Sequence, residues 1–587
     1  MPDFRIGEAD FLLDGEPVRI LSGSLHYFRV HPDDWADRIG KARLMGLNTI
    51  ETYVPWNAHS PRRGEFRTDG MLDLARFLRL VGEAGMHAIV RPGPFICAEW
   101  DRGGLPTWLF ADPEVGVRRH EKRFLEMVEE YLDAVLAVVA PLQVDRGGPV
   151  VLVQVENEYG AFGDDRAYLE AVADIIRRAG ITVPLVTVDQ PVDEMLAAGG
   201  LDGVLRTASF GSRSAERLRT LRAHQSTGPL MCMEFWDGWF DQWGSHHHTT
   251  SVEQAAEELD TLLAAGASVN VYMFHGGTSF GLTSGANDKG TYRPTITSYD
   301  YDAPLDEAGD PTPKYVAFRD VIARHSPVPD ELPAPRTPAP ELSAALGEPV
   351  PLLADPDAWG TATEHDGPPT LDELDGSPKL AVYVADLAGP DAPVVLSVGE
   401  VRDRAAVFLD GDPVGVLERE HHAHALVLPR GRGRLTLVVE DQGGVNYGPR
   451  IGETKGLIGP VRLSHPGGAE EVRGWSVRAL DLDALPSLWD RTDVRGAGPG
   501  PTAWRATFDA QASERHFLHT SGWGKGIAWV NGFCLGRYWR RGPQQTLFVP
   551  GPVVREGRNE LVVLELDVMA DPVARFVAAA VLGPLEP

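Results

Sequence analysis

Apolar positions along residues 1–325 follow two alternating patterns, one typical of buried strands and the other typical of helices. Short apolar runs predict strands at residues 19–27, 49–56, 87–94, 150–157, 185–189, 203–210, 230–236 and 268–277. Between the first two runs, one helical face is formed by Trp35, Ile39, Ala42 and Met45, and Gly46 can end this helix. Because parallel strands need crossover helices, eight such units predict a closed (β/α)₈ TIM barrel. A doubly wound open sheet is the structural alternative.

The pattern changes after a proline-rich segment at residues 326–340, which predicts an extended linker. Beyond it, short alternating runs are separated by turn residues, as is typical of all-β domains. Segments 407–416 and 528–537 carry an Asp-Gly or Asn-Gly turn at the same offset, and each precedes a second apolar strand, at 434–441 and 559–566. The sequence therefore predicts two related jelly-roll β-sandwiches, which either bind sugar or brace the barrel.

The predicted fold class is α/β plus all-β. The chain divides into a catalytic barrel (1–325), a linker and connecting segment (326–374), a first β domain (375–490) and a second β domain (491–587). This division places the chemistry before the linker and predicts a mainly architectural role for the β domains.

Charge and cysteine content narrow the class of function. The 587 residues include 84 acidic and 55 basic side chains, and the formal net charge of −29 disfavours nucleic acid and anionic membranes as partners. Residues 1–20 lack a basic and then apolar signal segment, and no run of about 18 apolar residues occurs, so a cytoplasmic protein is expected. The three cysteines lack C-x-x-C spacing and indicate neither a disulfide framework nor a zinc site. The sequence leaves the oligomeric state open.

Carboxylates and aromatic rings follow the predicted barrel strands, where the loops of such a barrel build an active site. The carboxylates and polar groups at these strand ends are Tyr53, Glu99, Asn157, Glu158 and Glu234. Aromatic rings on the same rim are Trp100, Trp236, Trp239 and Tyr301. A carboxyl pair with aromatic walls and no metal-ligand spacing is typical of glycoside hydrolysis, which needs neither a metal nor a cofactor.

The residues leave open which acid at the end of the fourth strand is catalytic. Glu156 and Glu158 share a face if the strand runs unbroken, but we expect the strand to break or bulge here. Asp300 and Asp302 are rival catalytic acids, although holding their own loop is the favoured role. The run at residues 246–248, three histidines, does not predict a metal site, because consecutive residues on an irregular segment do not converge on one ion.

Seven segments of the barrel region resemble the β-galactosidases of glycoside hydrolase family 35, in order along the chain. They are GSLHYFRV, ETYVPWNAHSPRRGEF, RPGPFICAEWDRGGLPTWL, QVENEYG, MEFWDGWFDQWG, NVYMFHGGTSFG and TSYDYDAPLDEAG. Two further segments, RDRAAVFLDGDPVGVLER and GWGKGIAWVNGFCLGRYW, resemble the galactose-binding-like β domains of that family. The resemblance implies a retaining exo-β-galactosidase that acts on terminal β-D-galactose of small-molecule or oligosaccharide galactosides.

The resemblance also implies roles for individual residues. Glu158 becomes the general acid and base, Glu234 the nucleophile, and Glu156 a supporting acid. The galactose hydroxyls are then held by Tyr53, the Ala98 backbone, Glu99, Asn157 and Tyr301, while Trp239 stacks on the ring. Trp236 departs from the family, in which this position is often tyrosine. Binding of the leaving group is therefore expected to differ from that in the family. A retaining mechanism requires the two catalytic carboxyls to lie ~5–5.5 Å apart.

Two other functions are compatible with these residues. An exo-β-glucosaminidase or another β-glycosidase on the same scaffold is one, because recognition of the sugar 4-hydroxyl depends on loop geometry. A catalytically silent sugar-binding protein is the other, and the presence of both catalytic glutamates disfavours it. The sequence does not indicate the linkage preference or the natural aglycone.

Overall fold

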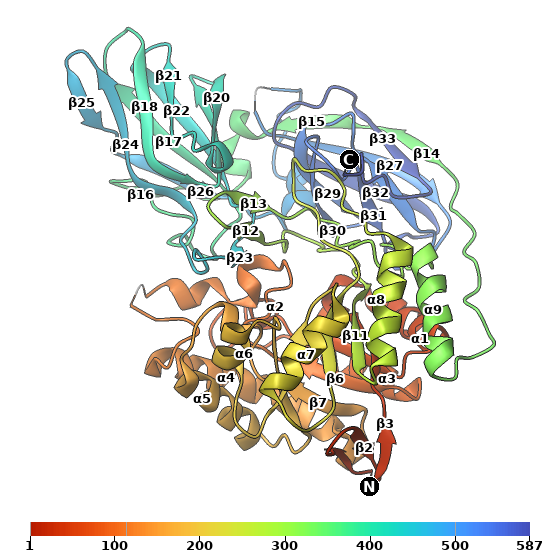
Figure 1. Cartoon of the computed structure of the whole chain (residues 1–587). Coiled ribbons are helices and arrows are strands. Elements are labelled where there is room, and N and C mark those ends of the chain that lie inside the picture. The colour runs from red at the N-terminus through yellow and green to blue at the C-terminus, as the bar shows by residue number, and fades with distance from the viewer. Residues whose placement is uncertain (1, 113, 499, 587) are drawn as a thin grey trace.

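The computed structural model describes residues 2–112, 114–498 and 500–586, and it contains a closed barrel of eight parallel strands (Figure 1). The barrel strands are β4 (Leu21–Leu25), β5 (Thr49–Tyr53), β6 (His87–Arg91), β7 (Val150–Gln154), β8 (Leu185–Asp189), β9 (Leu205–Ser209), β10 (Met231–Trp236) and β11 (Ser268–His275). They follow one another around the barrel in sequence order, and β11 closes it by pairing with β4. The predicted TIM barrel is confirmed, and the open-sheet alternative is wrong.

Helices cover the outside of the barrel (Figure 1). They are α1 (Trp35–Met45), α3 (Leu74–Glu83), α4 (Lys122–Val139), α5 (Arg166–Arg178), α6 (Asp193–Gly199), α7 (Ser214–His224), α8 (Val252–Ala264) and α9 (Pro313–His325). The short helix α2 (Trp56–His59) follows the end of β5 and lies on the side of the barrel that faces the sandwiches (Figure 1). Helix α1 buries the apolar face that the sequence predicted and ends at Gly46, whose φ of 100° lies in the left-handed region. A Cβ at Gly46 would lie 2.7 Å from the Val328 side chain, so glycine also lets the linker pass the end of the helix.

The first β-sandwich follows the linker, whose residues 326–340 form neither helix nor strand. Its six-stranded sheet contains β16 (Thr363–His365), β26 (Trp475–Ala479), β17 (Leu380–Ala388), β22 (Arg432–Glu440), β19 (Arg404–Leu409) and β20 (Asp412–Glu418). Its four-stranded sheet contains β21 (Ala425–Leu428), β18 (Val394–Arg402), β24 (Gly456–His465) and β25 (Gly468–Glu471). Apolar side chains of both sheets share one core. The β19–β20 turn has φ values of 52° at Asp410 and 88° at Gly411, as the predicted hairpin requires.

The second β-sandwich also has two antiparallel sheets. One contains β15 (Gly347–Pro351), β27 (Thr502–Ala510), β32 (Gly557–Glu565), β29 (Lys525–Val530) and β30 (Phe533–Trp539). The other contains β14 (Leu342–Ala345), β33 (Val573–Val577), β28 (His516–His519) and β31 (Thr546–Val549). Strands β14 and β15 lie in the predicted connecting segment, yet they pair with β33 and β27, so the chain contributes to the second sandwich before it builds the first. Apolar residues of both sandwiches, among them Val382 and Trp529, form a common cluster where the two units meet.

A small three-stranded sheet joins the barrel to the first sandwich (Figure 1). Strands β12 (Ala286–Asp288) and β13 (Tyr292–Pro294) belong to the chain that follows β11, whereas β23 (Val445–Tyr447) belongs to the first sandwich. Ala286 pairs with Val445 and Asn287 with Tyr447 in parallel register. Residues from the first sandwich are thereby brought to the mouth of the barrel.

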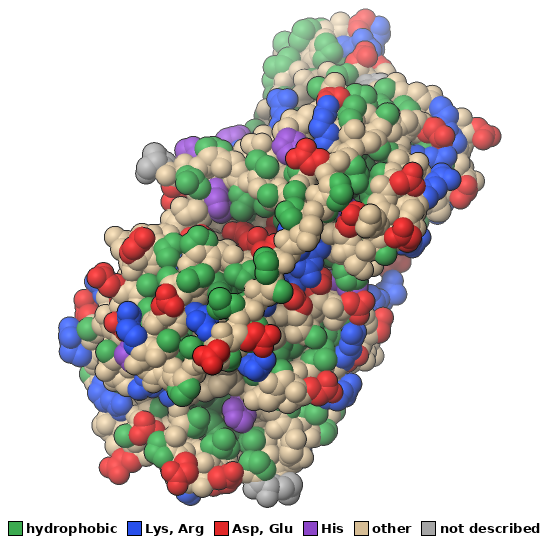
Figure 2. Space-filling model, turned by 90° about the vertical axis from the view of Figure 1, so that its right-hand side faces the viewer, with side chains coloured by type: hydrophobic (Ala, Val, Ile, Leu, Met, Phe, Trp, Pro, Cys, Tyr) green, Lys and Arg blue, Asp and Glu red, His purple; other side chains and the backbone are tan. Residues whose placement is uncertain are grey.

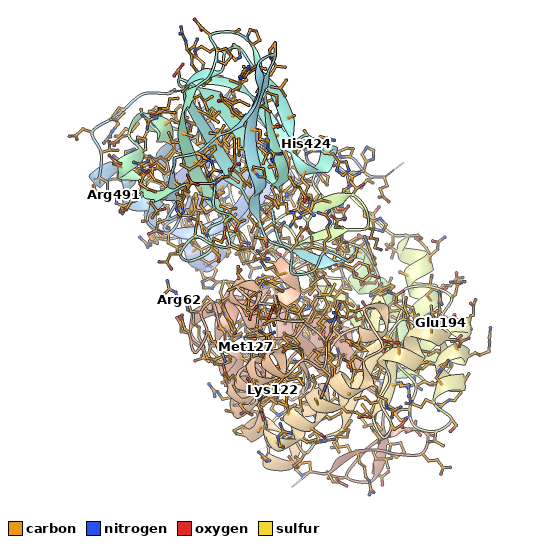
Figure 3. All side chains as sticks on the ribbon, turned by 90° about the vertical axis from the view of Figure 1, so that its left-hand side faces the viewer. Arg62, Lys122, Met127, Glu194, His424 and Arg491 are labelled. Carbon is orange, nitrogen blue, oxygen red and sulfur yellow. The ribbon has the colours of Figure 1, made fainter. Side chains whose placement is uncertain are left out.

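The remaining features concern the ends and surface of the molecule. An N-terminal sheet of β1 (Phe4–Ile6), β2 (Phe11–Leu13) and β3 (Glu16–Val18) lies at the end of the barrel away from the sandwiches (Figure 1). Side chains fill the barrel and both sandwiches, and Arg62 lies near their junction (Figure 3). Acidic and basic side chains are interspersed over the face shown in Figure 2. In the described part of the chain, none of the helices has the length and apolar character needed to cross a membrane.

Candidate active site

The strand β7 stops at Gln154, and the chain after it leaves the extended conformation. The φ angles of Glu156 and Glu158 are 57° and 44°, so the strand breaks where the sequence led us to expect a break. Glu156 is buried and accepts hydrogen bonds of 2.8 Å at each carboxylate oxygen from Arg118, with a third of 3.0 Å from Tyr168. Glu156 therefore anchors the loop, and Glu158 is the acid that faces the mouth.

A small pocket of about 100 Å³, here called the inner pocket, lies at the mouth of the barrel. The two proposed catalytic glutamates and all the proposed sugar-binding residues line this pocket: Tyr53, Ala98, Glu99, Asn157, Glu158, Glu234, Trp239 and Tyr301. Positive φ angles are concentrated here, with 52° at Ala98, 48° at Glu99 and 64° at Tyr301. Non-glycine residues adopt such angles at a cost in free energy, and they cluster at functional sites.

The carboxylate of Glu234 is held at both oxygens. Its Oε1 accepts hydrogen bonds from Tyr53 at 2.6 Å and from Nη2 of Arg91 at 2.5 Å. Its Oε2 accepts one of 3.0 Å from the indole N–H of Trp236. Glu234 is only 5% exposed, so the orientation of its carboxylate is set before any substrate arrives. The departure from the family at Trp236 therefore keeps a hydrogen-bond donor beside this glutamate.

Glu158 has a different environment from Glu234. Its Oε1 accepts a hydrogen bond of 2.7 Å from Ser209, at the end of β9. Burial raises the pKa of Glu158 to about 7, and the negative charge of Glu234 adds to the rise, while the Ser209 hydrogen bond acts against it. A carboxyl with this pKa can both give and take a proton near neutral pH.

Glu99 is a third carboxyl in the inner pocket. Its Oε2 accepts a hydrogen bond of 2.5 Å from Tyr299, whose ring lies 3.8 Å from the guanidinium carbon of Arg29. Burial raises the pKa of Glu99 to about 7, although the Tyr299 hydrogen bond and the Arg29 charge lower it. Arg29 also donates to the carbonyl oxygen of Ala98 at 2.5 Å, which fixes the backbone on this side of the pocket.

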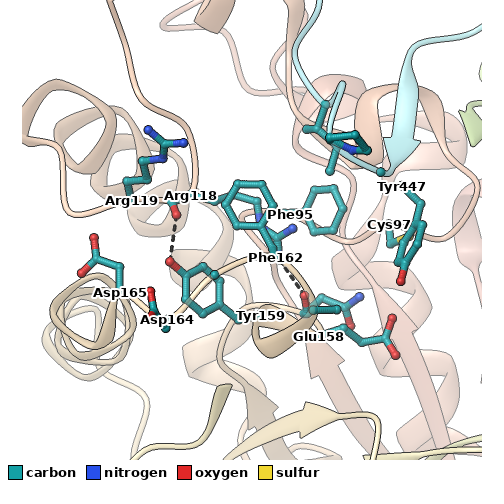
Figure 4. Close-up of a pocket in the computed structure, with 16 residues that line it drawn as sticks. Phe95, Cys97, Arg118, Arg119, Glu158, Tyr159, Phe162, Asp164, Asp165 and Tyr447 are labelled. Atoms are coloured by element: carbon teal, nitrogen blue, oxygen red, sulfur yellow. Dashed lines mark hydrogen bonds between the residues drawn. The ribbon is translucent and has the colours of Figure 1, made fainter. Parts of the chain in front are cut away.

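A wider pocket of about 720 Å³, here called the outer pocket, adjoins the inner one (Figure 4). The two share Cys97, Asn157, Glu158 and Tyr447. Aromatic rings of Phe95, Tyr159 and Phe162 line the outer pocket, together with the charged side chains of Arg118, Arg119, Asp164 and Asp165. An apolar ring surface beside polar groups suits the two faces of a sugar or aryl group.

Several residues of the site were missed in the sequence. They are Arg91, Ser209 and Tyr299 in the barrel region and Asn446 and Tyr447 in the first sandwich. Arg91 had a signal, because it is a charged residue at the end of an otherwise apolar strand. Asn446 and Tyr447 had none: both lie after the linker, whereas the two proposed catalytic glutamates lie before it, so the first sandwich adds residues to the rim of the site.

The other candidates have structural roles. Trp100 does not line either pocket; it is buried, donates to Asn57 at 2.9 Å and packs on Phe28. Asp302 accepts hydrogen bonds from Lys314 at 2.7 Å and Thr250 at 2.8 Å, and so holds its loop.

The remaining polar candidates do not form a metal site. Asp300 accepts from the backbone of Asp302 and Glu307. His247 pairs with Asp241 at 2.7 Å and His248 with Glu586 at 2.9 Å. Among residues 2–112, 114–498 and 500–586, no group of three or more His, Cys, Asp or Glu side chains is placed to hold a metal ion. Cys97 and Cys232 are both buried.

The closed barrel, the carboxyls at its mouth and the aromatic walls define a glycoside hydrolase. The family model described as glycosyl hydrolases family 35 matches residues 10–325. Models of the first all-beta domain and of the galactose-binding domain of beta-galactosidase match residues 368–481 and 501–559. The chain belongs to glycosyl hydrolase family 35.

Similar relatives align over nearly the whole chain. The beta-galactosidase of Xanthomonas manihotis is 39% identical, over 93% of this chain and 91% of the relative. Beta-galactosidase-1-like protein 2 of Homo sapiens is 38% identical, over 98% of this chain and 91% of the relative. The beta-galactosidase of Homo sapiens is 38% identical, over 95% of this chain and 86% of the relative.

Proposed function

We propose that the protein is a retaining exo-β-galactosidase that releases terminal β-D-galactose from the non-reducing end of galactosides. Glu234 is the nucleophile and Glu158 the general acid and base. The observation that carries the proposal is that both carboxyls line one small pocket, one held at both oxygens and the other with a pKa of about 7. The names of the similar relatives support galactose as the sugar.

In the first step, Glu234 attacks the anomeric carbon while the bond from that carbon to the leaving oxygen breaks. Protonated Glu158 gives its proton to this oxygen, so the aglycone leaves as a neutral alcohol. Because Ser209 donates to Oε1 of Glu158, Oε2 is the oxygen that carries the proton. The products of this step are the aglycone and a galactosyl ester of Glu234.

In the second step, Glu158 acts as a base. The ester at Glu234 no longer carries the negative charge that helped to raise the pKa of Glu158, so this pKa falls. Glu158 takes a proton from water, whose oxygen attacks the anomeric carbon and releases the Glu234 carboxylate. Two inversions leave the galactose in the β configuration.

The sugar is held by groups whose orientation is fixed in advance. Oδ1 of Asn157 accepts a hydrogen bond of 2.5 Å from Arg91 and lies 2.9 Å from the hydroxyl oxygen of Tyr53, which directs the amide nitrogen of Asn157 to the sugar. Glu99 and Tyr301 bind further hydroxyls, and the Ala98 backbone bounds the pocket beside them. Trp239, with 39% of its surface exposed, offers its ring to the sugar face.

The two pockets divide the substrate. Glu158 must reach the leaving oxygen and lines both pockets, so galactose occupies the inner pocket and the aglycone the outer one.

We propose domain boundaries at residues 325, 374 and 490, with strands β14 and β15 of the connecting segment contributed to the second sandwich.

A panel of nitrophenyl glycosides tests the proposal. Nitrophenyl β-galactoside should be cleaved with a much higher kcat/KM than the β-glucoside, the β-N-acetylglucosaminide or the α-galactoside. A β-glucosaminide cleaved faster than the β-galactoside would replace the proposed substrate. Sugar binding without cleavage of any member would replace the proposed catalysis.

A further inference from the structure

We propose that Asn446, in the first β-sandwich, is a positioning residue for Glu99 in the barrel, so that galactose binding depends on an amide beyond the linker. The inference rests on the proposed function, in which Glu99 binds a galactose hydroxyl. It gives the first sandwich a part in substrate binding in addition to packing.

The contact between the two side chains is buried. Asn446 has 0% of its surface exposed, and its Nδ2 lies 3.4 Å from Oε1 of Glu99. The same nitrogen lies 3.3 Å from Oδ1 of Asn287 and 3.4 Å from Sγ of Cys97. Tyr299 donates to the other oxygen of Glu99. The carboxyl plane of Glu99 is thus fixed by one donor from the barrel region and one from the first sandwich.

The segment that carries Asn446 is tied to the loop that carries Glu99. Asp101, two residues after Glu99, accepts hydrogen bonds from the backbone N–H of Gly444 at 2.6 Å and from Lys379 at 2.8 Å. Lys379 also lies 2.8 Å from Asp441, which precedes the segment. Asn446 and Glu99 therefore cannot move apart without breaking these partly buried ionic contacts and the Gly444 hydrogen bond.

A second set of contacts holds the same segment from the other side. The carbonyl oxygen of Gly443 accepts hydrogen bonds from Lys455 at 2.8 Å and from Tyr292 at 2.7 Å. Lys455 and its partner Asp403 are both fully buried, with Nζ 2.8 Å from each carboxylate oxygen. Removing one member of such a pair is costly, so the position of the Asn446 backbone is strongly determined.

The charge of Glu99 depends on the groups around it. The titratable groups that face it are Arg29, Cys97, Glu158, Glu234, Tyr272, Tyr299 and Tyr301. Donors at its oxygens favour the charged form, which accepts hydrogen bonds from sugar hydroxyls more strongly. Without the Asn446 amide, the pKa of Glu99 should rise above its value of about 7, and galactose binding should weaken at neutral pH.

The test compares Asn446→Ala and Asn446→Asp with the wild type on nitrophenyl β-galactoside. KM should rise roughly 10-fold in Asn446→Ala, as expected for one hydrogen bond to a charged group, while kcat changes less. The acidic limb of kcat/KM should move to higher pH in both variants, and further in Asn446→Asp, which places a second carboxyl beside Glu99. Asn446→Asp keeps the size of the side chain, so the test survives if Asn446→Ala does not fold.

Two controls separate positioning from general destabilisation. Asn559→Ala removes an equally buried amide from the second sandwich, where its nitrogen donates to Arg555 and Gly557, and should lower stability without moving the pH profile. In a Glu99→Gln background, Asn446→Ala should have little further effect on KM. Folded Asn446 variants with unchanged KM and pH profile, or losses that add in the double variant, would overturn the inference. A wild type inactive on every galactoside would overturn the proposed function, and this inference with it.

Discussion

Arg91 donates a hydrogen bond from Nη2 to Oε1 of Glu234 across 2.5 Å, and its Nη1 lies 3.6 Å from Glu51. The guanidinium is fully buried and lies 4.0 Å from the ring centre of Tyr53. A fixed cation between these two buried carboxyls offsets part of their negative charge and holds the proposed nucleophile in one orientation. Little reorganisation then remains for the chemical step.

Replacing Arg91 by methionine should harm both stability and catalysis. The change leaves Glu51 and Glu234 without their shared counter-ion, and breaking a buried pair in this way costs roughly 3–5 kcal/mol of unfolding free energy. We expect kcat to fall roughly 100-fold or more. Arg91→Lys keeps the positive charge but lacks the planar guanidinium group that reaches both carboxylates. It should therefore be more stable than Arg91→Met and still have a lower kcat than the wild type. Denaturant unfolding and steady-state kinetics measure the two effects, and a fully active Arg91→Met variant would contradict the role of this cation.

The pKa of about 7 at Glu158 predicts the basic limb of the pH profile. The acid form is lost as pH rises through the pKa, so kcat/KM for nitrophenyl β-galactoside should fall above about pH 7. A dinitrophenyl galactoside leaves without a proton, so its first step should depend less on pH in this range. If kcat/KM fell equally above about pH 7 for both substrates, the fall would not be due to deprotonation of Glu158.

Replacing Glu99 by glutamine should change how stability depends on pH. The folded state raises the pKa of Glu99 from 4.5 to about 7, so the stability that protonation confers is present below 4.5 and lost as pH rises through 7. The loss in the wild type is at most about 3 kcal/mol. Glutamine does not titrate, so the Glu99→Gln variant does not lose this part of its unfolding free energy. The unfolding free energy of the variant minus that of the wild type should therefore rise between about pH 5 and about pH 8. Denaturation midpoints at both pH values measure the trend, and Glu331→Gln on the exposed linker is the matched control, which should not show it.

The barrel and the hairpins of the sandwiches could be predicted because their signals are local. Each barrel strand is a short apolar run and each barrel helix has an apolar face. In the sandwiches, the Asp410-Gly411 and Asn531-Gly532 pairs mark hairpins through their positive φ angles. The residues assigned to the inner pocket could be named because they lie in motifs shared with a known family. Their hydrogen bonds could not be read from the sequence.

The unpredicted part of the site depends on contacts between distant segments. Asn446 reaches Glu99 because β23 pairs with β12 across the junction of the barrel and the first sandwich, and no local pattern encodes that pairing. The same holds for β14 and β15, whose partners in the second sandwich lie more than a full domain away in the sequence. In both cases, burial and ion pairing between the domains determine which strands pair, and the local secondary-structure propensity of the segment does not.

The division of labour between Glu158 and Glu234 is tested most directly by NMR identification of the azide products of the two alanine variants. Glu158→Ala should still form the galactosyl ester from aryl galactosides with good leaving groups, accumulate it, and give β-galactosyl azide when azide is added. Glu234→Ala should be inactive in the absence of azide on every galactoside. If azide instead gave β-galactosyl azide from Glu234→Ala and α-galactosyl azide from Glu158→Ala, or if the first product of the wild type were α-galactose, the assignment of both residues would be contradicted.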